Sequence, residues 1–271
     1  MVEPTAWNEV ARDHDYARLW SMKRTFGMNR QQPAVLGRDA DALPVINRCL
    51  VLAPHPDDFD VVAVTLRRIA AAGAKLHLEV LTSGASGVED AFAEGWSRKT
   101  LAREAEQLAS CRIFGLPEER IRFHRLAEDE GGHMESGAVN EARVWTILDR
   151  VLPDAVILPH GRDSNADHQR TFRMFEKWAK KRSDKTLALL VRDPKTLEMR
   201  LDLVTPFNQE EAEWKAEMLR CHASQHERNL RSRGYGIDER ILRMNREIAS
   251  QSGCGDDYAE GFEIRELGKA R

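Results

Sequence analysis

The sequence predicts an α/β fold in which a mainly parallel sheet is flanked by helices. This prediction depends on short apolar runs that alternate with segments of helical periodicity, on glycines that end several of those segments, and on polar clusters that directly follow two of the runs. A short apolar run that stops at a proline or a loop is typical of a strand buried on both faces. Strands that alternate with helices form βαβ units, which favours parallel pairing.

The expected elements follow one another along most of the chain. Strands are expected at 49–53, 75–82, 120–125, 155–158 and 186–191. Helices are expected at 60–72, 98–114, 138–152, 167–180, 209–226 and 238–250. The helix at 60–72 stops at Gly73 and the helix at 98–114 stops at Gly115, as helix C-termini commonly do. An apolar and polar alternation around 199–207 and the last two helices are expected to close one edge of the domain.

The first 45 residues differ from the rest of the chain. Apolar side chains from Trp7 to Trp20 recur at roughly helical spacing, and the stretch 29–43 has the composition of a connection. We therefore expect a helical extension over 1–45 and a single domain over 46–271. The extension could cover the site or form a subunit contact in a homo-oligomer.

Composition and charge limit the classes of function. The chain has 271 residues, of which 42% are apolar and 31% charged, an ordinary balance for one large globular domain. Its formal net charge is −3 with both signs interspersed, so no basic face for nucleic acid is expected. Arg228, Arg231 and Arg233 are interpreted as part of a solvated loop. No run reaches the ~20 apolar residues that span a bilayer.

The cysteines and the N-terminus favour the cytoplasm. The four cysteines are far apart and form no CxxC pair, which argues against a zinc knuckle and a disulfide framework. Cys49 and Cys111 lie in apolar-periodic segments and are expected to be buried thiols. The first thirty residues lack the apolar centre of a signal peptide.

Two predicted strands are followed directly by polar clusters. Pro54-His55-Pro56-Asp57-Asp58 follows the strand at 49–53, and a cluster from His160 to His168 follows the strand at 155–158. Ligand sites in open parallel sheets lie beyond the carboxyl ends of the strands, so we expect the two clusters to meet. Imidazole and carboxylate suit zinc and related divalent ions. Two histidines and one carboxylate also leave a position open for water, as a catalytic metal site requires.

Spacing within the first cluster indicates the roles of its members. His55 and Asp58 are three residues apart and can converge on one ion around a tight turn. Asp57 lies between them and stays free, as a candidate general base beside a metal-bound water. The alternative is that Asp57 or Asp58 only caps the helix at 60–72, in which case His55 would be superfluous.

His168 completes the expected ligand set from the first turn of its helix. In isolation it would be interpreted as a histidine at the edge of an apolar stripe, but Asp163, Asn165 and Asp167 precede it in a loop at a strand end. Asp167 is expected to hydrogen-bond a ligand histidine and fix its tautomer. His160 is the competing third ligand.

These motifs resemble a known family. His55-Pro56-Asp57-Asp58 with Asn165-Ala166-Asp167-His168 resembles the PIG-L (LmbE-like) family of zinc-dependent N-acetylglucosamine deacetylases. The resemblance runs from about residue 47 to 264. Further segments similar to the family follow in the expected order: Thr82-Ser83-Gly84, Arg103-Glu104, Gly115, Cys221-His222-Ala223-Ser224-Gln225 and Tyr258-Ala259-Glu260-Gly261-Phe262.

The resemblance implies a Rossmann-like domain with its active site at the carboxyl ends of the strands. His55, Asp58 and His168 would hold Zn²⁺, or another divalent metal such as Fe²⁺. The reaction would be hydrolysis of an N-acetyl group from an amino-sugar conjugate, with metal-bound water as nucleophile and Asp57 as general base. Asn165 would support catalysis with a hydrogen bond.

The sequence departs from the family pattern at three places. One is the usual Gly-Gly at the start of the next helix, which is replaced here by Val61-Val62-Ala63. Many members have a histidine where Asn165 stands; because an amide cannot transfer a proton at neutral pH, the identity of the general acid stays open. The family motif is usually HPDDE, whereas here Phe59 takes the place of the glutamate and the next acidic residue is Asp60.

The residues expected to bind substrate come from four segments. Ser83 lies in the Thr-x-Gly loop, and Arg103 could meet an anionic part of the substrate. Asp129 follows the strand at 120–125 and could accept hydrogen bonds from sugar hydroxyls, with a solvated acidic loop as the alternative. His160 belongs to the second polar cluster.

Three other functions stay open from the sequence. The same site could serve an amidase on a larger acylated conjugate, or the chain could be a carbohydrate-binding relative without catalysis. A nucleotide-binding protein is disfavoured, because no glycine-rich phosphate loop follows the first strand.

Overall fold

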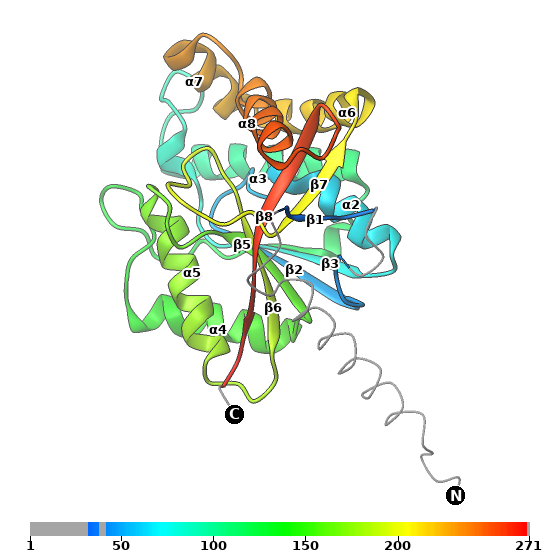
Figure 1. The fold of residues 1–271 in the computed structure, drawn as a ribbon. Coiled ribbons are helices and arrows are strands. Elements are labelled where there is room, and N and C mark those ends of the chain that lie inside the picture. Colours follow the sequence, from blue (N-terminus) through cyan, green and yellow to red (C-terminus); the bar gives the residue numbers. More distant parts are fainter. Residues whose placement is uncertain (1–31, 38–41, 270–271) are drawn as a thin grey trace, which may run out of the picture.

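The computed structural model describes residues 32–37 and 42–269. Eight strands form one sheet in the order β1-β7-β8-β6-β5-β2-β3-β4, with helices on both of its faces (Figure 1). Strand β8 is antiparallel to both of its neighbours, and every other pair is parallel. The predicted α/β fold with a mainly parallel sheet is therefore confirmed.

The elements have the following bounds. The strands are β1 Ala34–Val35, β2 Arg48–Ala53, β3 Lys75–Val80, β4 Ile121–Phe123, β5 Ala155–Pro159, β6 Thr186–Val191, β7 Leu203–Phe207 and β8 Tyr258–Leu267. The α-helices are α2 Ala63–Ala71, α3 Trp96–Phe114, α4 Ala138–Val151, α5 Ala166–Ala179, α6 Gln209–Arg220, α7 Ala223–Arg233 and α8 Ile237–Ser252. Short 3-10 turns η1 Asp60–Val62, η2 Ala85–Gly87 and η3 Glu118–Arg120 complete the description.

The central strand β2 shows why the sheet lies in the middle of the molecule. Cys49 and Val51 pack into one apolar cluster with residues of α2, α6 and α8, while Leu50 and Leu52 pack into another with residues of α4 and α5. A strand whose alternate side chains enter two cores must be apolar throughout, which is the pattern that predicted it. Burial together with the nearby carboxylate of Asp154 raises the pKa of the Cys49 thiol to about 12.

Three parts of the fold differ from the sequence-based expectation. The helix expected at 209–226 is two helices, because the chain turns at Cys221 and His222 between α6 and α7. Strand β8 was not expected, and it enters the sheet between β6 and β7. Strand β1, from the stretch interpreted as a connection, pairs with β7.

Two further expectations concern the N-terminal extension and membrane-spanning segments. Residues 1–31 and 38–41 lie outside the described residues, so the helical extension over 1–45 remains a prediction. Among the described helices, none combines the length and the apolar character that a membrane span requires.

Candidate metal centre and the cavity beside it

Two loops at the carboxyl ends of parallel strands bring the three expected ligands together. His55 and Asp58 come from the loop after β2, and His168 comes from the first turn of α5 after β5. One donor atom from each lies within 4.8 Å of the others. Asp58 is in the middle: one of its oxygens lies 3.5 Å from His55 Nδ1 and the other 3.6 Å from His168 Nε2.

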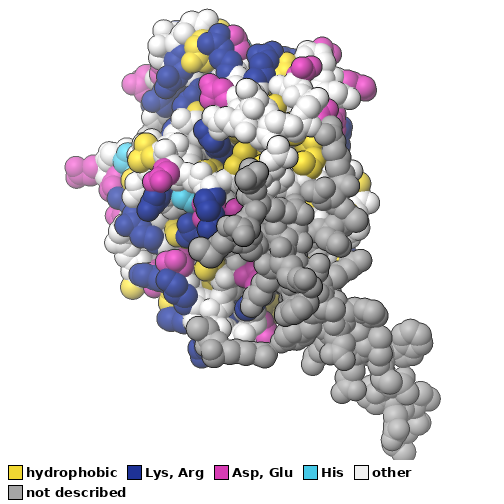
Figure 2. Space-filling view, viewed as in Figure 1, with side chains coloured by type: hydrophobic (Ala, Val, Ile, Leu, Met, Phe, Trp, Pro, Cys, Tyr) yellow, Lys and Arg dark blue, Asp and Glu magenta, His cyan; other side chains and the backbone are white. Residues whose placement is uncertain are grey.

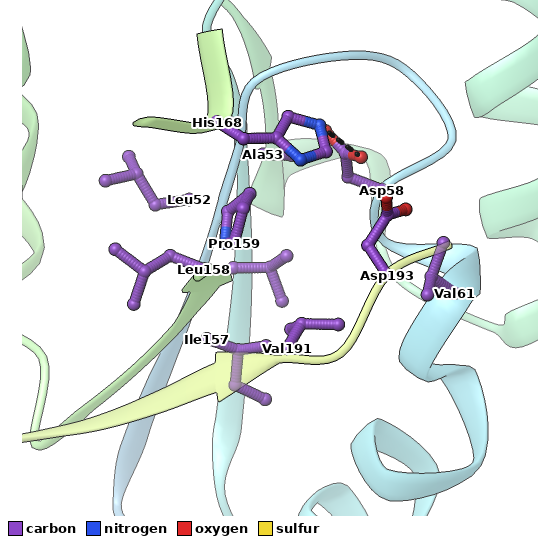
Figure 3. Close-up of a pocket in the computed structure, with 11 residues that line it drawn as sticks. Leu52, Ala53, Asp58, Val61, Ile157, Leu158, Pro159, His168, Val191 and Asp193 are labelled. Carbon is purple, nitrogen blue, oxygen red and sulfur yellow. Dashed lines mark ion pairs between the residues drawn. The ribbon is translucent and has the colours of Figure 1, made fainter. Parts of the chain in front are cut away.

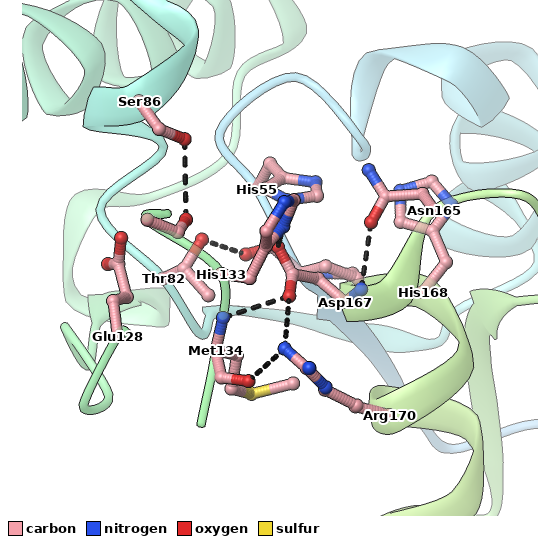
Figure 4. Close-up of polar contacts among 12 residues, drawn as sticks. His55, Thr82, Ser86, Glu128, His133, Met134, Asn165, Asp167, His168 and Arg170 are labelled. Carbon is pink, nitrogen blue, oxygen red and sulfur yellow. Dashed lines mark hydrogen bonds and ion pairs between the residues drawn. The ribbon is translucent and has the colours of Figure 1, made fainter. Parts of the chain in front are cut away.

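The second ring nitrogen of each histidine contacts a carboxylate. His55 Nε2 lies 3.0 Å from Asp167 (Figure 4). His168 Nδ1 lies 3.1 Å from Asp163. Such contacts fix the orientation and tautomer of a metal-binding imidazole. Asp167 therefore holds a candidate ligand histidine, as expected, and the structure identifies that histidine as His55.

The electrostatics of the three donors fit a divalent cation. His168 Nε2 is buried and has no hydrogen-bond partner among the described residues. Burial opposes protonation of His55, but its hydrogen bonds to Asp167 and Asp58 outweigh burial and raise its pKa to about 9. Burial likewise opposes ionisation of Asp58, yet His168 and His55 lower its pKa below the usual range. The carboxylates around His55 favour positive charge at its ring, and Asp58 is held ionised, so the three donors suit a cation. Two imidazoles with one carboxylate match zinc or iron.

Asp57 is held beside the three donors in a strained turn. Its φ of 116° lies in a region that a non-glycine residue seldom adopts. Helix α3 supports this backbone: the Asp57 amide donates to Gln107 Oε1 at 2.9 Å, and Arg103 donates to the carbonyl of Pro56. Arg103 Nη2 also lies 3.1 Å from the Asp57 carboxylate, although only 2% of the arginine side chain is exposed. The carboxylate is thereby fixed by a buried guanidinium.

A glycine allows the neighbouring loop to approach this turn. Gly84 has a φ of +64°, and a Cβ there would lie 3.0 Å from the Pro56 ring and 3.2 Å from Arg103 Nε. Any other residue would combine backbone strain with overlap against the loop that carries Asp57. The segment 82–84 therefore supports the site through its backbone.

A cavity of about 550 Å³ opens beside the candidate ligands. Asp57, Arg103 and Asn165 line it, together with His55 and Asp58. Asn165 caps α5 by accepting a 2.8 Å hydrogen bond from the Asp167 amide through its side-chain oxygen. The amide nitrogen of Asn165 is turned away from that bond (Figure 4), which leaves it available as a donor.

Three residues expected to bind substrate do not line this cavity. Ser83 and Asp129 line a different pocket, and Ser83 is held there by Glu128, which accepts from both its amide and its hydroxyl. Asp129 accepts hydrogen bonds from the amides of the loop that follows it. His160 is buried, with its ring stacked on Phe172 and its Nε2 3.4 Å from Glu263. Its position explains why it is not part of the three-donor group.

Asp193 belongs to the site but was not expected from the sequence. It follows β6, and its carboxylate lies within 4.8 Å of donor atoms of Asp163 and His168. Figure 3 shows it facing the same small pocket as Asp58 and His168. The rule that pointed to the loops after β2 and β5 applies equally to the loop after β6, so the signal was present.

The arginines interpreted as a solvated loop are on helix α7. Arg228 and Arg233 line the cavity, whereas Arg231 lies outside its lining and pairs with Glu89. His133 also lines the cavity and lies 3.4 Å from Asp167, and no role was expected for it from the sequence. The sequence pattern missed the cavity residues that lie far along the chain from the two polar clusters.

Comparison with solved structures shows the fold. N,N'-diacetylchitobiose deacetylase from Pyrococcus horikoshii is 17% identical, with a TM-score of 0.69 over 98% of this chain and 95% of that chain. A deacetylase of the teicoplanin biosynthetic pathway is 17% identical, with a TM-score of 0.63 over 83% of this chain and 100% of that one. GalB, the 4-carboxy-2-hydroxymuconate hydratase from Pseudomonas putida KT2440, is 19% identical, with a TM-score of 0.61 over 80% and 95%.

The family model gives the remaining comparison. No curated protein matches the sequence. The model described as GlcNAc-PI de-N-acetylase matches residues 50–179, the segment from β2 to α5 that carries all three candidate ligands. The resemblance of this segment to the PIG-L family is therefore confirmed.

Proposed function

We propose that this protein is a metal-dependent deacetylase that removes the acetyl group from an N-acetylated amino-sugar conjugate. The observation that carries the proposal is the position of Asp57, whose carboxylate is fixed by buried Arg103 beside the three donors and lines the same cavity. The family match and the two deacetylases of the same fold support the choice of an amide as the bond that is cleaved.

The proposed roles follow from the chemistry of each side chain. His55, Asp58 and His168 would hold the metal, with zinc as the first candidate and iron as the second. When bound, the metal supplies a Lewis acid that polarises the acyl carbonyl and lowers the pKa of water. Asp57 takes the proton from the attacking water as general base.

The departing amine also needs a proton, and Asn165 cannot supply it. In our proposal Asp57 returns the proton that it took, so one carboxylate serves both steps. Asn165 instead donates a hydrogen bond from its amide nitrogen to the oxyanion that forms on the acyl carbon.

The experiment measures release of free amine and acetate from a panel of N-acetylglucosamine conjugates by the zinc-loaded protein. We expect turnover by the wild type and a decrease in kcat of about 10²- to 10⁴-fold for Asp57→Asn. Metal content should stay near one ion per chain in both proteins. Asp184→Asn is the matched control, since Asp184 is exposed and lies just before β6, at the opposite end of that strand from the site.

Four outcomes would separate the alternatives. Turnover that survives Asp57→Asn would remove the assigned base. Metal binding without turnover of any acetylated sugar, but with release of larger acids, would favour an amidase on a larger conjugate. Metal binding without any hydrolysis would favour a carbohydrate-binding relative, and the absence of metal binding would overturn the proposal.

A further inference from the structure

The wall of the cavity formed after β6 and by α7 and α8 is basic. Lys195, Arg228, Arg233 and Arg240 all line it, and α7 and α8 contribute no acidic residue to the lining. Figure 2 shows Lys and Arg side chains gathered on the part of the surface where Figure 1 places α7 and α8. Among the residues that the structure describes, none of these four cations forms an ion pair with a carboxylate.

Cations of the same helices that do not line the cavity are paired. Arg231 contacts Glu89 and Glu227, and Arg243 on α8 contacts Glu239. Arg246, also on α8 and outside the lining, donates to the Tyr258 hydroxyl. Within the described part of the chain, only the arginines of α7 and α8 that line the cavity therefore lack a side-chain partner. This asymmetry argues against an ordinary solvated helix face, on which both groups would be neutralised alike.

Asp193, which also follows β6, is the one acidic residue that this part of the lining contributes among the described residues, and its charge acts on Lys195 and Arg240 without an ion pair to either. The acidic residues at the donors have other partners. Asp57 is paired with Arg103, while Asp58 and Asp167 contact His55. Arg240 is half-buried; burial first, and then the neighbouring charge of Arg233, lower its pKa, and the carboxylates of Asp193 and Asp57 only partly oppose this. Like charges crowded in a partly buried wall are unfavourable unless an anion joins them.

We propose that Lys195, Arg228, Arg233 and Arg240 form a subsite for an acidic group, a carboxylate or a phosphate, on the sugar conjugate. This inference rests on the proposed function, because it places the acidic group on the substrate whose amide meets Asp57. Arginine side chains bind both kinds of anion with paired hydrogen bonds. The acetyl group is cleaved at the donors while the rest of the conjugate extends toward α7 and α8.

The test compares three probes that differ only at the anomeric substituent: methyl N-acetylglucosaminide, its carboxymethyl analogue and N-acetylglucosamine 1-phosphate. For the metal-loaded wild type, kcat/KM should be at least about 10-fold higher for one acidic probe than for the methyl glycoside. This preference should decrease as the salt concentration rises. Comparison of the carboxymethyl and phosphate probes identifies which anion the subsite takes.

Variants then assign the preference to the cavity wall. Arg233→Gln and Arg240→Gln should each lower the ratio of acidic to neutral kcat/KM by about 10-fold. Arg231→Gln is the matched control: it removes one arginine from the same helix but outside the cavity, and it should leave the ratio unchanged. Equal ratios in all three variants and the wild type would overturn the subsite.

Binding measured by calorimetry separates failure of the subsite from failure of the proposed function. If no probe is hydrolysed but an acidic probe binds the wild type about 10-fold more tightly than it binds Arg240→Gln, the subsite stands and the reaction must be revised. If the neutral probe is hydrolysed as fast as both acidic probes, the reaction stands and the subsite is overturned. Absence of any preference in both turnover and binding also overturns it.

Discussion

Two buried polar clusters lie close to the start of α2, and they differ in how completely their hydrogen bonds are satisfied. In the first, Lys215 donates to the carbonyl of Val61 at 2.5 Å, to Asn245 at 3.1 Å and to Glu260 at 2.6 Å. Glu260 in turn accepts from the amides of Val64 and Thr65. All three protons of the ammonium are used in hydrogen bonds. Lys215, Asn245 and Glu260 do not line the pockets beside the candidate ligands.

The second cluster, the candidate metal centre, leaves one position open. His168 Nε2 lies 3.6 Å from Asp58 but has no hydrogen-bond partner among the described residues, whereas His55 Nε2 and His168 Nδ1 each lie within hydrogen-bond distance of a carboxylate. The comparison teaches that burial of charge alone does not indicate function. In a structural network every donor and acceptor has a partner within the protein, whereas a functional site leaves a donor or acceptor free to bind a ligand.

The largest expected effect breaks the satisfied cluster. Lys215→Met removes the only cation beside Glu260 in this network and leaves that carboxylate buried without its charge partner. Removing one member of a buried ion pair typically costs about 3–5 kcal/mol. We expect a decrease of this size in the free energy of unfolding, measured by urea titration.

Lys177→Met is the control for this variant. Lys177 pairs with Glu141 at the surface, where its side chain is 60% exposed. Exposed pairs contribute about 0–1 kcal/mol, so the control should be nearly as stable as the wild type. Equal losses in the two variants would show that the Lys215 network has no special role.

The second largest expected effect is stabilisation of the protein when a metal binds at the second cluster. A divalent metal that binds only the folded protein should stabilise it by about 2.7 kcal/mol at one hundred times its Kd. We expect Zn²⁺ to raise the Tm of the wild type and of Lys177→Met, and to leave the Tm of His168→Ala unchanged. Thermal unfolding of each protein with zinc and after chelation measures this difference.

A rise in the Tm of His168→Ala equal to that of the wild type would place the metal elsewhere. Asp163→Asn sharpens the test, because Asp163 contacts His168 without being one of the three proposed ligands. Loss of such a supporting carboxylate typically weakens metal affinity by about 10- to 100-fold. Zinc should therefore still raise the Tm of Asp163→Asn, but by less than that of the wild type.

Local sequence patterns predicted the centre of the molecule well. The strand at 49–53 and the helix at 167–180 are each identified by their own apolar spacing, so their neighbours in space were not needed. His55, Asp58 and His168 follow from the same argument, because the carboxyl ends of neighbouring parallel strands must meet. Strand β2 pairs directly with β5, which brings the two loops together.

The remaining features depend on contacts between distant segments. Strand β8 carries Glu260 for the Lys215 network and Glu263 opposite His160, so charged residues interrupt its apolar pattern for reasons that only the fold reveals. Asp60 stands one position after the family's usual acid, and it is buried because His222, 162 residues away, lies 2.6 Å from it. Contacts between residues so far apart in the chain leave no periodic pattern in the local sequence.

The smallest expected effect concerns a histidine–carboxylate pair outside the cavity. Burial lowers the pKa of His160 in spite of Glu263, whereas the carboxylates around His55 raise its pKa. Below about pH 6.5 the unfolded chain therefore binds a proton that folded His160 does not. The free energy of unfolding should decrease as the pH falls through this range, with a limiting slope of about 1.4 kcal/mol per pH unit, and this contribution should vanish above it.

The difference between wild type and His160→Gln isolates this contribution, because Glu263 and the other titrating groups are present in both proteins. Between pH 7 and pH 5.5 we expect the free energy of unfolding to decrease more for the wild type than for the variant. The imidazole resonances of His160 should show protonation at a lower pH in the folded protein than in the unfolded chain. A ring that becomes protonated above pH 6.5 would mean that Glu263 outweighs burial, and His160 would then behave like His55 rather than like a structural histidine.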